Sequence, residues 1–390
     1  MTNLTLVVVT SLLSAQSPDW SAAADALAAK HADEAKVVRL TATSSVTNLT
    51  DGLRAVRPTH VAFVMRPEEI DFPTVVGMKR MMRALDDDPF DDAKWGIVTG
   101  PTAADARRIA SSREPRQIRS LLATTGVDDG VIPGPLACLS DAYPAGEWRL
   151  KASDGSVAKH SSSNDISHVF AKAWDDLDPN LILTSSHASQ RNLEMPFSRG
   201  NIVPRNGVFQ TQPNEELIDY RTGQAKESRG ASGEKAVVLS APTQEKVWLA
   251  AGNCLIADNL RPGENMVMTA LGFGKVNQFV GYISTTWFGE IGWTTWANFR
   301  EGMSLVDAYY AANDKLLHEL EETVENASAF QPTFASAKDY ERLFKEARAF
   351  KFKAPKRIED PQKFIGRLWD RDATVFYGDP LVQVYLNPKE

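Results

Sequence analysis

The chain has 390 residues, of which 43% are hydrophobic and 24% charged, and its formal net charge is −7. This length exceeds what a single hydrophobic core usually serves, so two subdomains are expected. The acidic balance and the scattered basic residues argue against nucleic acid as a partner, because phosphate binding needs a basic surplus on one face. The two cysteines, Cys138 and Cys254, are too few for a disulfide framework and lack the paired spacing of a zinc site.

The first residues are apolar and end on small side chains, as a secretory signal would. A signal also carries a positive first region, whereas the first basic residue here is Lys30. We therefore interpret residues 4–10 as a β-strand. No run of about 18 apolar residues occurs, so no membrane partner is expected. The cysteine usage favours a reducing compartment and a cytoplasmic location, with secretion left open.

Strand-like and helix-like patterns alternate along the first 111 residues. Strands are expected at 4–10, 36–40, 60–65 and 95–99, and helices at 20–30, 46–56, 72–85 and 103–111. Regular alternation of this kind predicts a parallel sheet with helices on both faces. Residues 126–164 are rich in Gly, Pro and Ser, which predicts turns and a boundary. We accordingly divide the chain into an N-terminal α/β subdomain, 1–140, and a second subdomain, 141–390.

The second subdomain resumes with a helix and two short apolar runs separated by a long polar stretch. Its expected elements are a helix at 165–177, strands ending before His187 and Cys254, a polar insertion at 190–235, a helix at 264–271, a strand at 276–285 and a long helix at 296–324. A long insertion beside a site is typical of a lid, a substrate-binding loop or a cleavable segment. A charged helical segment at 330–365 follows, and residues 373–386 predict a hairpin-like or edge strand that closes the chain.

The two apolar runs each end on a reactive residue. One reads Asn180-Leu-Ile-Leu-Thr-Ser-Ser-His187 and the other Lys246-Val-Trp-Leu-Ala-Ala-Gly-Asn-Cys254. Such runs predict buried parallel strands, and in open α/β sheets the chemistry sits at the carboxyl ends of strands. A histidine beside a thiol can hold the sulfur as a thiolate and protonate a leaving group. A lone cysteine is more often a buried structural residue, which is our interpretation of Cys138.

Other motifs fall short of their patterns. Gly272-Phe-Gly274 lacks the third glycine of a dinucleotide fingerprint, and residues 230–235 lack P-loop spacing. The acidic run at 86–92 has no calcium-loop spacing and predicts a solvated loop. No G-x-S-x-G elbow occurs. No metal and no cofactor are therefore expected.

The order of these elements resembles the clan CD cysteine peptidases, the caspase-like group, and within it is most similar to the gingipain family. In that group a histidine follows one hydrophobic block and the cysteine follows the next, as His187 and Cys254 do. The narrower likeness lies in the strand 276–284, the aromatic segment 285–293, the helix containing 303–309, and Tyr377-Gly-Asp-Pro380. This chain has Ala188 where the family has glycine after the histidine, and Asn253 before the cysteine.

The resemblance implies an α/β, caspase-like fold with mainly parallel sheets flanked by helices in two subdomains. It also implies a cysteine endopeptidase that acts on a peptide or protein substrate through an acyl-enzyme. Cys254 would be the nucleophile, His187 the proton donor, and the backbone N–H groups of Ala188 and Cys254 the oxyanion hole. The oligomeric state and any third catalytic residue stay open.

The segment after the next strand would form the substrate-binding wall. Its candidate substrate-binding residues are Trp287, Phe288, Glu290 and Trp293. The Glu290 carboxylate could select a basic substrate side chain. Two alternatives remain: a catalytically inactive caspase-like scaffold, and a small-molecule-binding α/β protein with a structural thiol.

Overall fold

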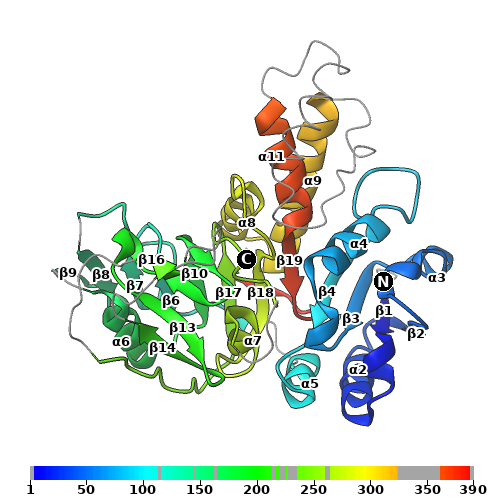
Figure 1. The fold of residues 1–390 in the computed structure, drawn as a ribbon, viewed down its shortest axis with the longest axis horizontal. Helices are drawn as coiled ribbons and strands as arrows, with labels where there is room; N and C mark the ends of the chain where they lie inside the picture. The colour runs from blue at the N-terminus through cyan, green and yellow to red at the C-terminus, as the bar shows by residue number, and fades with distance from the viewer. Residues whose placement is uncertain are drawn as a thin grey trace.

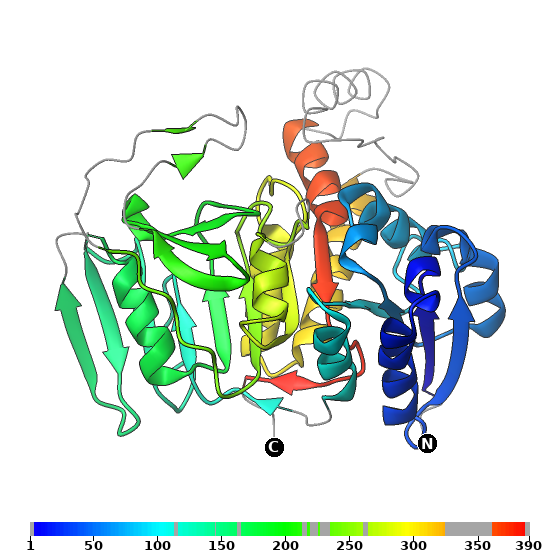
Figure 2. The same ribbon diagram turned by 60° about the horizontal axis from the view of Figure 1, so that its bottom comes forward.

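A twelve-stranded sheet runs through the molecule (Figure 1). The computed structural model describes residues 4–112, 116–144, 146–161, 165–212, 217–218, 225–226, 235–259, 264–323 and 361–386. Within these residues the strand order is β2-β1-β3-β4-β19-β18-β17-β10-β6-β7-β8-β9. Helices flank the sheet, as the two views in Figures 1 and 2 show. The predicted α/β class with a large, mostly parallel sheet is confirmed.

The N-terminal half follows the expected alternation closely. Its strands are β1 (Thr5–Thr10), β2 (Lys36–Thr41), β3 (His60–Val64) and β4 (Lys94–Val98), and all the pairings among them are parallel. The intervening helices are α1 (Leu12–Ala15), α2 (Pro18–Lys30), α3 (Thr50–Val56), α4 (Phe72–Met82) and α5 (Ala103–Ser111), with 3₁₀ turns η1 (Val46–Asn48) and η2 (Pro67–Glu69). β1 and β3 are almost wholly buried, because inner strands of a parallel sheet are covered on both faces.

The second half contains the strands that carry His187 and Cys254. Its part of the sheet comprises β6 (Leu121–Ala123), β7 (Leu136–Leu139), β8 (Glu147–Lys151), β9 (Val157–Ser161), β10 (Leu181–Thr184), β17 (Lys246–Ala250) and β18 (Val276–Tyr282). β10 lies between β6 and β17 and is parallel to both. The boundary predicted after residue 140 falls between β7 and β8, which are neighbours in the sheet.

Two expectations for the second half were wrong in detail. The turn-rich zone at 126–164 contains β7, β8 and β9, which are short, and β9 is exposed on both faces, so no apolar alternation marked it. The long helix expected at 296–324 is two helices, α8 (Glu290–Arg300) and α9 (Leu305–Thr323). The break between them contains Gly302, whose φ of 94° an L side chain rarely adopts. The other helices here are α6 (Ser167–Leu177) and α7 (Met266–Leu271).

The polar insertion after His187 forms a small antiparallel sheet. Its strands are β11 (Ala188–Ser189), β12 (Asn192–Glu194), β13 (Asn201–Arg205) and β14 (Val208–Gln212), with the 3₁₀ turn η3 (Pro196–Ser198) between β12 and β13. Two further two-stranded pairs are β15 (Leu217–Ile218) with β16 (Ala225–Lys226), and β5 (Arg116–Gln117) with β20 (Val384–Tyr385). The small antiparallel sheet therefore begins at Ala188, the first residue after His187.

The closing strand is central, which corrects the expectation of an edge strand. β19 (Thr374–Tyr377) inserts between the two halves, where it runs antiparallel to β18 and pairs with β4 at Tyr377 and Ile97. It continues directly from α11 (Pro361–Ala373), which packs beside α9 (Figures 1 and 2). A local pattern cannot identify a strand's neighbours. An edge strand is expected from the sequence because Gly378-Asp-Pro380 interrupts the apolar pattern, and proline within sheets is mostly confined to edge strands. Most of the charged helical segment expected at 330–365 lies outside the described residues, which resume at 361.

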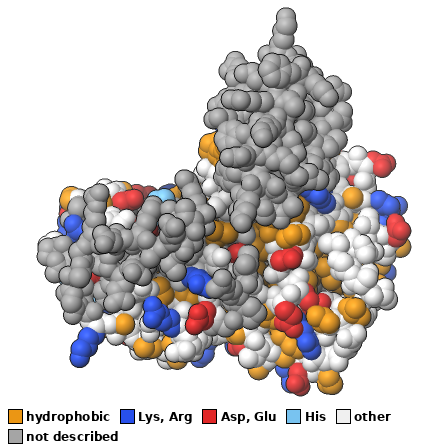
Figure 3. Space-filling model, viewed as in Figure 1, with side chains coloured by type: hydrophobic (Ala, Val, Ile, Leu, Met, Phe, Trp, Pro, Cys, Tyr) orange, Lys and Arg blue, Asp and Glu red, His pale blue; other side chains and the backbone are white. Residues whose placement is uncertain are grey.

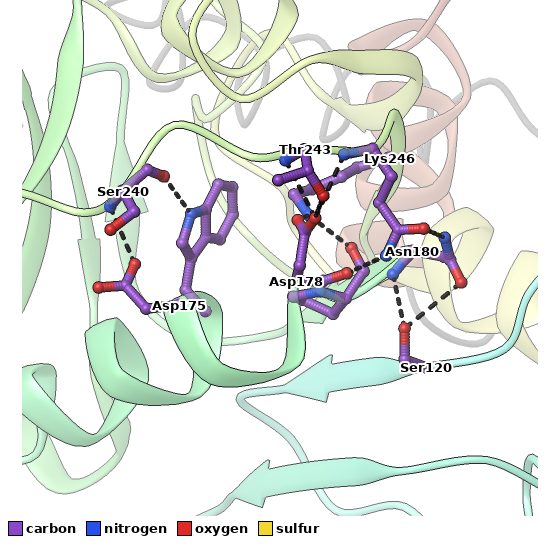
Figure 4. A network of polar contacts seen from close by, with 10 residues as sticks. Ser120, Asp175, Asp178, Asn180, Ser240, Thr243 and Lys246 are labelled. Carbon is purple, nitrogen blue, oxygen red and sulfur yellow. Dashed lines mark hydrogen bonds and ion pairs between the residues drawn. The ribbon is translucent and has the colours of Figure 1, made fainter.

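A polar network fixes the amino ends of β10 and β17 against each other (Figure 4). The buried Lys246 ammonium pairs with the Asp178 carboxylate and donates to the Pro179 carbonyl at 2.9 Å. Asp178 also accepts from the Thr243 and Gln244 N–H groups at 3.0 and 3.2 Å. Because Asp178 ends α6 and Lys246 begins β17, the network ties the helix before β10 to the start of β17.

Asp379 of the Gly-Asp-Pro turn holds a second buried charge cluster. Its carboxylate pairs with Lys30 and lies 2.7 Å from Nε2 of His31, at the end of α2. Burial alone would raise the pKa of Asp379, but the hydrogen bond to His31 and the Lys30 charge lower it to about 2. Burial likewise acts to lower the pKa of His31, but Asp379 outweighs it and raises that pKa above 6.5.

Among the described residues, acidic and basic side chains are interspersed over the face seen in Figure 3. Hydrophobic side chains also reach this surface between them. None of the described helices is both long and apolar enough to cross a bilayer.

Replacing Asp379 by Asn should lower the free energy of unfolding by roughly 3–5 kcal/mol, because it leaves buried cations without their partner. In the wild type, the stabilisation from ionised His31 is fully present below pH 6.5 and is lost as pH rises through its folded-state pKa. The stabilisation from Asp379 is present above pH 3.8 and is lost as pH falls towards 2. Urea unfolding from pH 2 to 9 should show that Asp379→Asn weakens both the acidic and the alkaline dependence of stability on pH. Asp25→Asn, at an exposed carboxylate that pairs with Arg39 and not with His31, is the control.

Candidate active site

The carboxyl ends of β10 and β17 bring His187 and Cys254 to one edge of the sheet. The two strands pair in parallel from Leu181 with Val247 to Thr184 with Ala250. The pairing continues one step further, since the Ala251 N–H donates to the Thr184 carbonyl at 2.8 Å. The segments that follow β10 and β17 therefore leave the sheet at the same side, because neighbouring parallel strands have their carboxyl ends there.

Asn253 ties the two departing segments together. Its side-chain amide donates to the Ser186 carbonyl at 2.8 Å, and its Oδ1 accepts from the Thr184 hydroxyl at 2.6 Å. The Thr184 hydroxyl in turn accepts from the Trp248 indole N–H at 3.0 Å. Asn253 is fully buried. Ser186 directly precedes His187 and Asn253 directly precedes Cys254, so this one amide links the two segments next to both residues.

Cys254 is partly exposed and lies in a strained turn. Its Sγ is 3.9 Å from the carbonyl oxygen of Thr286, beyond the end of β18. The next residue, Leu255, has a φ of 57°, a left-handed conformation that costs a branched side chain free energy. Its N–H donates to the Ser284 carbonyl at 2.9 Å, which holds the turn against β18. A strained backbone conformation of this kind persists only where the surrounding structure holds it in place.

His187 is exposed and begins the insertion sheet. Its carbonyl accepts from the Glu194 N–H at 2.9 Å, and Ala188 pairs with Leu193 in the β11–β12 ladder. Hydrogen-bonded and non-hydrogen-bonded pairs alternate in an antiparallel ladder, so the Ala188 N–H points away from β12. β11 is an edge strand of its sheet. The N–H of Ala188, the residue after His187, therefore points outward from the open edge of this small sheet.

The aromatic segment after β18 lies against the same turn. Phe288 and Trp293 are 47% and 37% exposed, while Trp287 is half-buried. The N-terminus of α8 packs directly on the backbone at residue 251, since a Cβ on Gly292 would collide with the Ala251 carbonyl. These contacts bring the expected wall next to the chain that leads into Cys254.

Glu290 is occupied by an internal cation. Its two carboxylate oxygens accept from Nε and Nη2 of Arg367 on α11, both at 2.9 Å, and Arg367 also pairs with Glu319 at 2.8 Å. The Glu290 side chain is 27% exposed. A substrate cation at Glu290 would have to displace a bidentate guanidinium, and periodicity in the sequence could not reveal that partner.

The second thiol has a different environment. Cys138 is buried in β7, donates to the Thr125 carbonyl at 3.1 Å and accepts from the Tyr143 hydroxyl at 3.3 Å. Burial raises the pKa of the Cys138 thiol, which disfavours the thiolate. Among the described residues no group of three or more His, Cys, Asp or Glu side chains could hold a metal ion.

Sequence reasoning identified Asn253 only as a departure from the family pattern. Replacing it by Ala leaves the Thr184 hydroxyl and the Ser186 carbonyl without their partner, which should cost about 1–3 kcal/mol of unfolding free energy. Hydrogen exchange of the amides at 185–188 should accelerate more than exchange elsewhere. Asn253→Asp is the second variant: it keeps an acceptor for Thr184, but it replaces the donor to Ser186 by a buried carboxylate oxygen that faces the Ser186 carbonyl. Equal protection of 185–188 in all three proteins would contradict the role assigned to Asn253.

Comparison with known proteins gives a structural likeness only. No protein-family model matches the chain, and no curated protein matches its sequence. The chain is similar to the complex of the pro- and mature domains of Porphyromonas gingivalis RgpB, with a TM-score of 0.48 and 8% identity over 97% of this chain and 79% of that one. It is also similar to a structure described as a protease, with a TM-score of 0.46 and 11% identity over 98% of this chain and 79% of the other. The similarity expected to a gingipain is thus confirmed as a likeness in structure at low sequence identity.

Proposed function

We propose that this protein is a cysteine endopeptidase that hydrolyses peptide bonds through Cys254 and His187. The observation that carries the proposal is the Asn253 amide, which joins the segments bearing these two residues at the carboxyl ends of adjacent parallel strands. A purely structural cysteine would be expected to be buried, like Cys138, and not partly exposed in a strained turn. Site geometry, and not the overall fold, supports the assignment.

In the proposed reaction the Cys254 thiolate attacks the carbonyl carbon of the scissile bond. The N–H groups of Ala188 and Cys254 stabilise the resulting oxyanion, and protonated His187 gives its proton to the departing amine. A thioester between Cys254 and the acyl half of the substrate remains. Water then attacks the thioester while His187 accepts its proton, which releases the carboxylic acid and restores the Cys254 thiolate and protonated His187.

Wild type should cleave members of a mixed-peptide library and react at Cys254 with a thiol-directed peptidyl probe. Cys254→Ala should do neither, because it removes the nucleophile. Cys138→Ala is the matched control: it removes the other thiol, which is buried, and should leave cleavage and labelling unchanged. Product formation and intact mass measure the two outcomes.

His187→Ala should lower the cleavage rate by roughly 10²- to 10⁴-fold, the usual contribution of general acid–base catalysis. A folded wild type that neither cleaves nor labels would reject the peptidase and favour an inactive scaffold or a small-molecule-binding protein. Labelling without cleavage would point to a reactive thiol in a non-peptidase.

A preference for basic residues is a finer proposal that depends on Glu290. Glu290→Gln should weaken cleavage after Arg and Lys relative to other residues, because the side chain loses the charge for which a substrate cation competes with Arg367. Glu319→Gln is the control, since Glu319 shares Arg367 but lies on α9. Library cleavage followed by mass spectrometry gives the preference of each variant. An unchanged preference in Glu290→Gln, or an equal change in Glu319→Gln, removes Glu290 as the selector.

A further inference from the structure

The buried carboxylate of Asp370 binds several backbone N–H groups of the aromatic segment beside Cys254. Asp370 on α11 accepts from the N–H groups of Trp287, Phe288 and Gly289 at 2.6, 2.7 and 3.0 Å. It also accepts from the Thr286 hydroxyl at 3.2 Å. Its own side chain is fully buried. Successive N–H groups pointing at one centre form an anion-binding concavity, and here the anion comes from the protein itself.

The carboxylate is stabilised by these donors and not by a neighbouring cation. None of the ion pairs between described residues includes Asp370, and Arg367 and Arg371 on the same helix are engaged with Glu290 and Asp372. Burial raises the pKa of Asp370 to about 6, although its hydrogen bonds oppose this. At neutral pH the group is therefore ionised and can accept from all four donors.

The segment at 286–289 depends on Asp370 for its shape. Gly289, at the start of α8, makes no side-chain cap of its own, and its φ is 68°. Three consecutive N–H groups in the segment use the same distant carboxylate. On its other side the segment reaches the site, since the Thr286 carbonyl lies 3.9 Å from Cys254 Sγ. One short stretch thus connects Asp370 to the thiol.

Other side chains of α11 contact the same segment. The Trp369 indole donates to the Thr285 carbonyl at 2.5 Å, and Arg367 holds Glu290. Gly366 lies so close to Trp287 and Phe288 that a Cβ there would overlap both rings. α11 leads without a break into the central strand β19, so the segment rests on a support anchored in the middle of the sheet.

We propose that Asp370 is the positioning residue that shapes the substrate-binding segment at 286–289 beside Cys254. This inference rests on the proposed peptidase function for its effect on catalysis. Asp370 touches neither the thiol nor a substrate directly; it acts through Thr286, Trp287 and Phe288. The effect on turnover should accordingly appear mainly in substrate binding.

The test compares wild type, Asp370→Asn and Asp372→Asn. Asp372 is the matched control, because it is an equally buried carboxylate on the same helix that pairs with Arg83 and Arg371 and not with the segment. Hydrogen exchange at pH 7.5 reports the amides of 287–289 without reference to activity. In Asp370→Asn they should exchange at least tenfold faster, since the amide that replaces one carboxylate oxygen cannot accept; in Asp372→Asn they should keep their protection.

Kinetics supply the second readout. Asp370→Asn should raise KM for a cleaved peptide at least tenfold with a smaller change in kcat, while alkylation of Cys254 by iodoacetamide stays within threefold of wild type. Unchanged exchange at 287–289, or faster exchange with unchanged KM, overturns the proposal, as does an equal rise of KM in Asp372→Asn. A wild type without peptidase activity overturns the proposed function instead, and the exchange comparison then still decides whether Asp370 shapes the segment.

Discussion

The pairing of β10 with β17 is the constraint on which the candidate site depends. Lys246 and Asp178 set their relative position at the amino ends, and Asn253 joins the chains again beyond the carboxyl ends. Side chains alternate between the faces of a sheet, so a slip by one residue would reverse every side chain in the strand. Anchors at both ends prevent such a slip. The same anchors fix where the residues after each strand emerge.

Buried charge joins the two halves of the molecule into one body. Asp372 on α11 accepts from Arg83, beyond α4, at 2.9 Å and also pairs with Arg371. Lys79 on α4 is fully buried and donates to the hydroxyls of Tyr309 and Thr374 at 3.2 and 3.1 Å. Burial lowers the pKa of Lys79 to about 8. Because unpaired buried charges are costly, this cluster favours one arrangement of α4, α9 and α11.

That arrangement has a consequence for the candidate site. α11 and β19 come from the end of the chain, yet they stand in the middle of the sheet and hold the segment that borders Cys254. The thiol is approached by segments that follow three strands, β10, β17 and β18. A support on this third side complements the Asn253 amide on the first two, and pre-organisation of this kind is what the proposed nucleophile would require.

The sequence by itself determined the elements with strong local signals. Apolar runs such as 6–9 and 181–183, and the helix periodicity of the first half, predicted strands and helices correctly, because burial on both faces leaves a continuous apolar pattern. It also placed His187 and Cys254 at strand ends. Tertiary structure alone decided that β19 is central, that Arg367 occupies Glu290, and that Asn253 and Asp370 hold the segments around the thiol. Each of these depends on partners at least 67 residues apart in the sequence. A local pattern does not indicate which distant group satisfies a buried polar atom.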